Sequence, residues 1–181
     1  MEFKEYQELA LQTWGGPQKK RRAVFALVSE VGEVIGKIEK KWRTDYAGNE
    51  EKFKEQVSKE IGDTLYYIAV LAYEFNFNIT DYTPLSEVVD VTYADDYEVG
   101  LNTLIDELAW CAYYTMSTYN TSENDRLIQD EDEDVILGVY NSLRDLTWYL
   151  CLDIQEIANQ NIAKLKDRAE RNMIKGSGDE R

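Results

Sequence analysis

The strongest constraint on the fold is a helical repeat, because an apolar residue recurs every three or four positions along most of the chain. That spacing places apolar side chains on one face of an α-helix. Only two prolines interrupt the chain, and the alternation that is typical of strands is weak. The sequence therefore predicts an all-α fold, an antiparallel helix bundle. The expected helices cover residues 2–14, 18–42, 50–75, 97–119 and 133–150, and a last one begins after Asp153 and ends near 171.

The chain contains no histidine, which excludes Ser–His and Cys–His nucleophile pairs and histidine-ligated metal sites. Acid–base or metal chemistry must then rest on carboxylates, lysines or tyrosines. Cys111 and Cys151 lie in apolar, aromatic surroundings in the sequence, and we expect two reduced core cysteines. The N-terminal residues do not resemble a signal peptide, and no apolar run approaches the ~20 residues of a membrane helix. We expect a cytoplasmic protein without membrane contact.

The charge is distributed unevenly along the chain. The net charge is −15, and residues 81–156 hold 18 acidic and 2 basic residues, whereas the rest holds 17 acidic and 18 basic ones. Such a charge disfavours direct nucleic-acid binding. We interpret 1–181 as a single helical domain in which 81–149 is an acidic helical insertion. Alternatively, this segment is a degenerate second copy of the first carboxylate-bearing helices. Asp145-Leu-Thr-Trp-Tyr resembles Asp63-Thr-Leu-Tyr-Tyr, and Leu104-Ile-Asp-Glu resembles the Glu30 region.

Two carboxylate pairs carry the chemical signal, Glu30-Val-Gly-Glu33 and Glu60-Ile-Gly-Asp63. Carboxylates three residues apart project from one face of a helix. A single pair of this kind usually marks a solvated face, but here two pairs with a central glycine stand on adjacent helices that should pack antiparallel. Converging carboxylates repel one another unless a cation lies among them. With no histidine or thiolate nearby, the pattern predicts Mg²⁺, with Mn²⁺ as a possible substitute. A close helix–helix or helix–ligand approach would explain the two glycines.

The same arrangement resembles the signature of the MazG-like, all-α nucleoside triphosphate pyrophosphohydrolases. The segment 6–13 is similar to the opening helix of phage-type members, and 161–168 and 176–179 are similar to their closing helix and tail. The resemblance covers about residues 1–80 and 150–181, and the acidic segment departs from the short family pattern. It implies a bundle of the MazG-like type that assembles as a homodimer. A degenerate second copy would instead form a pseudo-dimer within one chain.

The resemblance implies Mg²⁺-dependent hydrolysis of a nucleoside triphosphate, with a dNTP as the expected substrate, to the monophosphate and pyrophosphate. Such an enzyme adjusts a nucleotide pool, in the host cytoplasm if a phage encodes it. Glu33, Glu60 and Asp63 would hold the metal against the phosphates. Glu30 is expected nearest the attacking water, as a ligand or as the catalytic base.

Six further residues are candidates for substrate binding. The family pattern implies that Asn161 and Lys164 contact the substrate, and Arg168 lies one helical turn beyond Lys164. Tyr67 shares the helix face of Asp63, and an aromatic side chain of this kind can pack on a base. The full set is Trp42, Tyr67, Asn161, Lys164, Arg168 and Lys175. Each of these residues also fits a role without substrate contact, as a core aromatic or a solvated surface group.

Another class of function fits the same sequence. An acidic helical interaction module on this scaffold would bind a basic protein or mimic the charge of a nucleic acid. Neutralising the acidic run 130–134 would then abolish partner binding. A purely structural bundle is a third reading, and a requirement for Mg²⁺ separates the enzyme from both.

Overall fold

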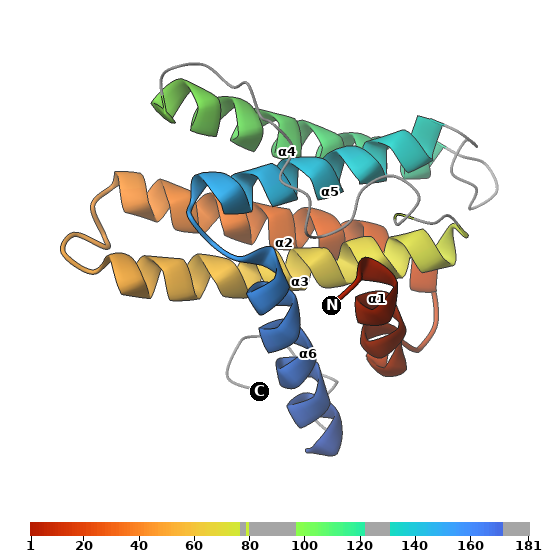
Figure 1. The fold of residues 1–181 in the computed structure, drawn as a ribbon. Coiled ribbons are helices and arrows are strands. Elements are labelled where there is room, and N and C mark those ends of the chain that lie inside the picture. Colours follow the sequence, from red (N-terminus) through yellow and green to blue (C-terminus); the bar gives the residue numbers. More distant parts are fainter. Residues whose placement is uncertain (77–78, 80–96, 122–130, 172–181) are drawn as a thin grey trace.

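The computed structural model describes residues 1–76, 79, 97–121 and 131–171, and these form helices and turns without a strand. This confirms the expected all-α class. Figure 1 shows the arrangement of the helices. They are α1 (Phe3–Ala10), the 3-10 helix η1 (Leu11–Thr13), α2 (Lys19–Trp42), α3 (Glu50–Glu74), α4 (Tyr97–Thr121), α5 (Glu131–Tyr149) and α6 (Ile154–Glu170).

The helix boundaries agree with the sequence pattern except at the N-terminus. The expected helix 2–14 is α-helical only to Ala10 and continues as a 3-10 turn to Thr13. The Thr13 hydroxyl donates to the Ala10 carbonyl at 2.9 Å, and Trp14 adopts an extended conformation. The chain therefore turns before Gly15-Gly16-Pro17. Asp153 caps α6 as expected, because its carboxylate accepts the Gln155 amide at 2.8 Å.

Two antiparallel helix pairs are stacked on each other (Figure 1). The α2–α3 pair forms one layer and the α4–α5 pair the other, with α2 against α4 and α3 against α5. Asn49 begins α3, since its side chain accepts the Lys52 amide at 3.1 Å. In the loop before it, Tyr46 is buried with its ring 5.4 Å from that of Phe53. The loop is thereby anchored and the register of the α2–α3 pair is fixed.

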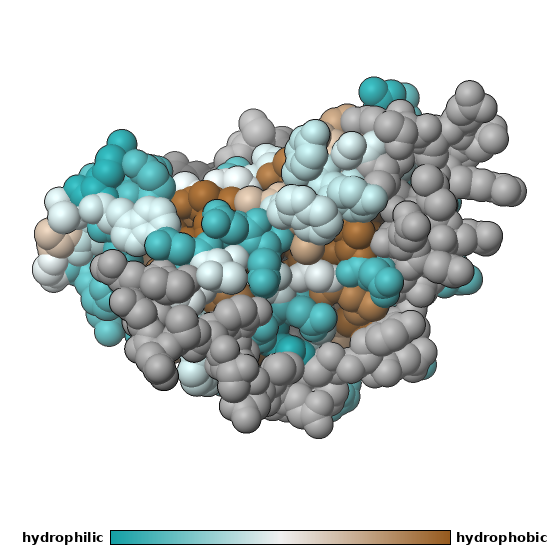
Figure 2. All heavy atoms as spheres, turned by 90° about the horizontal axis from the view of Figure 1, so that it is seen from above, coloured by the Kyte–Doolittle hydropathy of each residue, from teal (hydrophilic) through white to brown (hydrophobic). Residues whose placement is uncertain are grey.

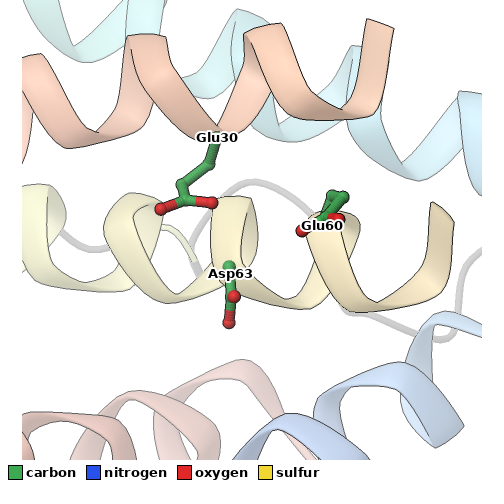
Figure 3. A group of neighbouring side chains, drawn as sticks. All are labelled: Glu30, Glu60 and Asp63. Atoms are coloured by element: carbon green, nitrogen blue, oxygen red, sulfur yellow. The ribbon is translucent and has the colours of Figure 1, made fainter. Parts of the chain in front are cut away.

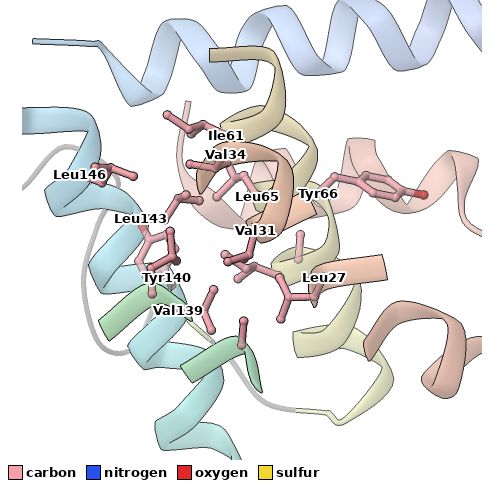
Figure 4. Close-up of a cluster of buried hydrophobic side chains, with 14 of the residues drawn as sticks. Leu27, Val31, Val34, Ile61, Leu65, Tyr66, Val139, Tyr140, Leu143 and Leu146 are labelled. Carbon is pink, nitrogen blue, oxygen red and sulfur yellow. The ribbon is translucent and has the colours of Figure 1, made fainter. Parts of the chain in front are cut away.

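The core lies between these two layers (Figure 4). Leu27 and Val31 of α2, Leu65 of α3, and Val139 and Leu143 of α5 converge there, and each side chain is at most 2% exposed. Burying side chains of this size contributes about 1.5–3 kcal/mol each. Residues of α5, within the acidic segment 81–149, thus form part of this core. None of the described helices is long and apolar enough to cross a membrane.

Both cysteines are free thiols, as expected, but only one lies near the core. Cys111 is half-buried, and its sulfur would lie 2.8 Å from a Cβ built on Gly138. Glycine at that position therefore lets α4 and α5 approach closely. Cys151 is exposed at the turn before α6. The expectation of a core position was wrong for Cys151.

The remaining helices cover the other side of α3. Both α1 and α6 pack against α3 and against each other (Figure 1). In α1, Phe3 and Tyr6 are buried, and the Phe3 ring lies 5.4 Å from that of Tyr140 on α5. The middle of α3 is thereby enclosed by helices from both ends of the chain.

Candidate metal centre

Three of the four predicted carboxylates converge in the structure. Glu30 projects from α2 toward α3, which carries Glu60 and Asp63 (Figure 3). One oxygen from each of the three lies within 4.8 Å of the others. Glu33 is exposed and lies outside this three-oxygen group. Its charge still reaches Glu30, where it contributes to the raised pKa described below.

Glu60 is the deepest of the three carboxylates, with the residue 1% exposed. A buried carboxylate is costly unless a cation or hydrogen-bond donors compensate it. Lys37 of α2 supplies the cation, with its Nζ 2.9 Å from Glu60 Oε1. The sequence pattern missed Lys37, although it stands seven residues after Glu30 and therefore on the same face of α2.

Both oxygens of Asp63 meet a donor from α6. Asn161 Nδ2 donates to Oδ1 at 2.9 Å, and Lys164 Nζ lies 2.5 Å from Oδ2. The Tyr6 hydroxyl donates to Asn161 Oδ1 at 2.9 Å, which turns the amide nitrogen toward Asp63. The structure thus brings Asn161 and Lys164, which were predicted to contact substrate, to the carboxylates. Tyr6 was identified only as part of the opening helix.

Gly62 explains how α6 comes so close. A Cβ built on Gly62 would lie 3.2 Å from both Cβ and Nδ2 of Asn161. Any larger residue would push α6, and Asn161 with it, away from Asp63. The expected close approach is therefore confirmed at Gly62. At Gly32 it was wrong, because that residue is exposed and a Cβ there would meet nothing within 4 Å.

The surroundings of Glu30 disfavour its ionised, negatively charged form. Burial, and then the negative charges of Asp63, Glu33 and Glu60, raise its pKa to about 7, while Lys164 lowers it. A carboxyl with such a pKa exchanges its proton near neutral pH. The same field attracts a cation. The protonation of Glu30 should therefore depend on whether a positive ion is present.

The donor set suits a hard divalent cation. Three carboxylates from two rigid helices offer only oxygen ligands, which Mg²⁺ and Mn²⁺ prefer over softer metals. Lys37 and Lys164 partly compensate the negative charge of these groups in the metal-free protein. Among the described residues this is the one group of carboxylates or thiols with metal-ligand spacing. The residues therefore fit an ion of this class, held by Glu30, Glu60 and Asp63.

An aromatic pocket opens one helical turn from the carboxylates. It has a volume of about 290 Å³ and is lined by residues of α2, of the segment before it and of α3: Trp14, Gln18, Arg21, Arg22, Phe25, Ala26 and Tyr67. Tyr67 connects the two sites, because burial and then the nearby Glu30 charge raise its pKa to about 12. Its phenol therefore stays protonated and can donate a hydrogen bond. The Arg22 guanidinium lies 5.0 Å from the centre of the Trp14 ring.

Of the other predicted substrate residues, the structure places Trp42 away from the cluster and Arg168 beyond Lys164 on α6. Trp42 is 54% exposed at the end of α2, roughly 18 Å along the helix axis from Glu30 at ~1.5 Å per residue. The structure does not bring Trp42 to the cluster. Arg168 lies one turn beyond Lys164, and its Nε is buried without an acceptor among the described residues. Lys175 lies outside the described residues.

Comparisons with family models, with curated proteins and with solved structures found no match for this chain.

Proposed function

We propose that the protein hydrolyses a nucleoside triphosphate to the monophosphate and pyrophosphate, with a divalent cation at Glu30, Glu60 and Asp63. The observation that carries this proposal is the convergence of three carboxylate oxygens within 4.8 Å beside lysines and an aromatic pocket. Carboxylates and lysines together match a polyphosphate that arrives with its metal ion. The similarity of the two carboxylate pairs to the MazG-like signature points to the same chemistry.

In the reaction, a water oxygen attacks the α-phosphorus, the bond from that phosphorus to the bridging oxygen breaks, and pyrophosphate leaves. Mg²⁺ would supply charge neutralisation at the phosphates and lower the pKa of the water. Glu30 would either help to hold the ion or, as the carboxylate nearest the water, accept the proton of the attacking water, and its pKa of about 7 suits the second role. The leaving pyrophosphate then departs with the negative charge that the bond cleavage places on the bridging oxygen.

The basic side chains of α6 would bind the phosphates of the substrate. Lys164 is bound to Asp63 at 2.5 Å in the free protein. A divalent ion held by Asp63 would displace the lysine, whose ammonium group would then be available for phosphate oxygens. Arg168 extends the same face of α6, and a buried guanidinium nitrogen without an acceptor suits an anion. Asn161 keeps Asp63 oriented, and Tyr6 keeps Asn161 oriented.

The aromatic pocket would receive the base and sugar. A stacked or edge-on aromatic contact with Trp14 or Tyr67 tolerates any base, so selectivity depends on the polar groups of the pocket. Arg21 and Arg22 line the same pocket. Their donors favour acceptor groups on the base or phosphate oxygens.

A panel of dNTPs and NTPs with Mg²⁺, with the products separated, tests the proposal. We expect monophosphate and pyrophosphate from a subset of nucleotides, and loss of at least ~10²-fold in kcat/KM for Glu60→Gln and Asp63→Asn. Glu55→Gln is the matched control, an exposed carboxylate on the same helix. No turnover on any nucleotide by the folded protein, or equal losses in Glu55→Gln, would contradict the proposal.

A further inference from the structure

The α4–α5 pair repeats the α2–α3 pair in the placement of its side chains. Aligning Asp63 with Asp145 superimposes buried positions of α3 on buried positions of α5, and aligning Glu30 with Glu107 does the same for α2 and α4. The buried pairs include Phe53 and Val135, Val57 and Val139, Ile61 and Leu143, Val24 and Leu101, Leu27 and Leu104, and Val31 and Leu108. With the carboxylates paired in this way, buried positions of the first helix pair therefore fall on buried positions of the second.

The electrostatics of the two pairs are alike in one respect. Burial raises the pKa of Asp145, the adjacent Arg144 guanidinium lowers it, and the negative charge of Glu107 raises it by a smaller amount. In the first pair, the charge of Asp63 raises the pKa of Glu30 in the same sense. Glu107 of α4 and Asp145 of α5 also line one pocket.

A pocket of about 570 Å³ lies where the second carboxylates meet. Its lining includes Asp106, Glu107, Trp110, Ser142 and Asp145. Figure 2 views the molecule from the side of α4 and α5 and shows apolar surface beside hydrophilic side chains on this face. The volume exceeds what a metal ion needs and falls within the range of small-molecule sites.

The pocket differs from the metal centre at a position that matters for an ion. Ser142 corresponds to Glu60, and Trp110 corresponds to Glu33, which lies outside the three-carboxylate group. One of the three carboxylates that could hold an ion is therefore replaced, and Glu107 and Asp145 are absent from the described clusters with metal-ligand spacing. The second pair thus has an acidic pocket without the ligand set of a divalent cation.

The remaining groups point to a charged organic molecule. Asp145 is 8% exposed, and its nearest cation, Arg144 Nη2, stands 3.6 Å from Oδ1. No lysine or arginine is among the residues that line the pocket. Trp110 is 59% exposed and stacks on Tyr114, with the ring centres 5.0 Å apart. A pocket lined by carboxylates and an aromatic side chain offers the groups that bind ammonium and guanidinium ions.

We propose that the pocket between α4 and α5 binds a small organic cation, a primary ammonium or guanidinium group on a flat apolar body, without a metal. Asp145 and Glu107 contact the charged group, Ser142 accepts a further hydrogen bond from it, and Trp110 covers the apolar body. The site is separate from the proposed catalytic centre. Its ligand therefore binds whether or not that centre holds an ion.

Calorimetric titration of the full chain in EDTA tests this proposal with tryptamine as the probe. Tryptophol has the same indole body with a hydroxyl in place of the ammonium group, and indole-3-acetate carries the opposite charge. We expect saturable binding of one tryptamine per chain and at least about tenfold weaker binding of tryptophol. Indole-3-acetate should not bind.

Substitutions in the pocket test whether tryptamine binds between α4 and α5. Asp145→Asn should weaken tryptamine binding about tenfold, and the exposed Trp110→Ala, which leaves the core intact, about fivefold. Glu8→Gln removes one exposed carboxylate from α1 and should change nothing. The proposal is overturned if tryptophol binds as well as tryptamine, if Trp110→Ala binds like the parent, or if tryptamine gives no saturable heat at millimolar concentration.

Discussion

Asp63 has both of its oxygens engaged by α6, one by Asn161 and one by Lys164. The lysine therefore competes with a divalent ion for the same carboxylate. Replacing Lys164 by methionine keeps the apolar stem and removes the competitor and a positive charge. Lys164→Met should bind Mg²⁺ about tenfold more tightly in the absence of nucleotide.

The same substitution should lower kcat/KM by ~10²-fold, because the released lysine is needed at the phosphates. Calorimetry with Mg²⁺ alone and steady-state kinetics separate the two effects. Lys166→Met, an exposed neighbour on α6, is the matched control for both. Weaker Mg²⁺ binding in Lys164→Met would show that the lysine supports the ion rather than competing with it.

Glu30 stabilises the folded protein only while it is protonated. Its folded pKa of about 7 lies above the value of an exposed glutamate, so the folded state holds a proton that the unfolded chain has lost. Stability therefore falls as the pH rises from about 4.5 to about 7. Glu30→Gln mimics the protonated form, so at pH 8 without metal it should be more stable than the parent by about 1 kcal/mol, a value reduced for solvent screening.

Denaturant unfolding at pH 8 and pH 5 measures this difference, which should nearly vanish at pH 5. The variant should also lose turnover. A Glu30→Gln protein that is less stable than the parent at pH 8 would contradict the placement of this carboxylate.

At the residue scale, the sequence predicted most of the carboxylate cluster but not Lys37, the cation that compensates the charge of Glu60. Glu30, Glu60 and Asp63 were identifiable because i,i+3 pairs on adjacent antiparallel helices can converge. Glu33 has the same spacing, yet it faces solvent, because helix rotation of a few tens of degrees decides which end of a pair enters the interface. The Lys37 contact with Glu60 depends on that rotation as well, and pattern alone does not supply it.

At the scale of helices, two glycines with the same sequence context have opposite roles. Gly62 faces Asn161 on α6, where a Cβ would lie 3.2 Å from two of its atoms, whereas Gly32 faces open space. Gly62→Ala should lose about 1–2 kcal/mol of stability and most activity, because α6 must shift. Gly32→Ala should gain up to about 1 kcal/mol, since alanine favours a helix.

Urea unfolding of both variants, with activity at a fixed Mg²⁺ concentration, measures the contrast. The two substitutions add the same methyl group, so each controls for the other. Equal effects at both positions would mean that α6 does not pack on α3 at Gly62.

Helix positions were predictable from the sequence, but packing partners were not. The apolar repeat placed the ends of α2, α3 and α6 closely, and side-chain caps mark the starts of two of these helices, Asn49 at α3 and Asp153 at α6. The pattern could not show that α1 and α6, from opposite ends of the chain, meet on one side of α3. That contact brings Tyr6 to Asn161, and it depends on long-range packing.

Across the whole molecule, the two helix pairs share one core, so the carboxylate cluster is coupled to global stability. An ion that binds only the folded state stabilises all of it, by about 2.7 kcal/mol at a concentration ~100 times its Kd. For a chain of this size that raises Tm by roughly 5–10 °C. We expect such a rise with Mg²⁺ at pH 8 in the absence of nucleotide.

The rise should depend on pH in a defined direction. A proton on Glu30 excludes the ion from that carboxylate, and with a pKa of about 7 the apparent affinity at pH 6 falls about tenfold. A fixed Mg²⁺ concentration near the pH 8 Kd should therefore raise Tm at pH 8 and barely at pH 6. Scanning calorimetry with NaCl at matched ionic strength removes general salt effects, and Glu60→Gln removes one ligand. A shift of the same size at both pH values, or in Glu60→Gln, would place the ion elsewhere on this acidic protein.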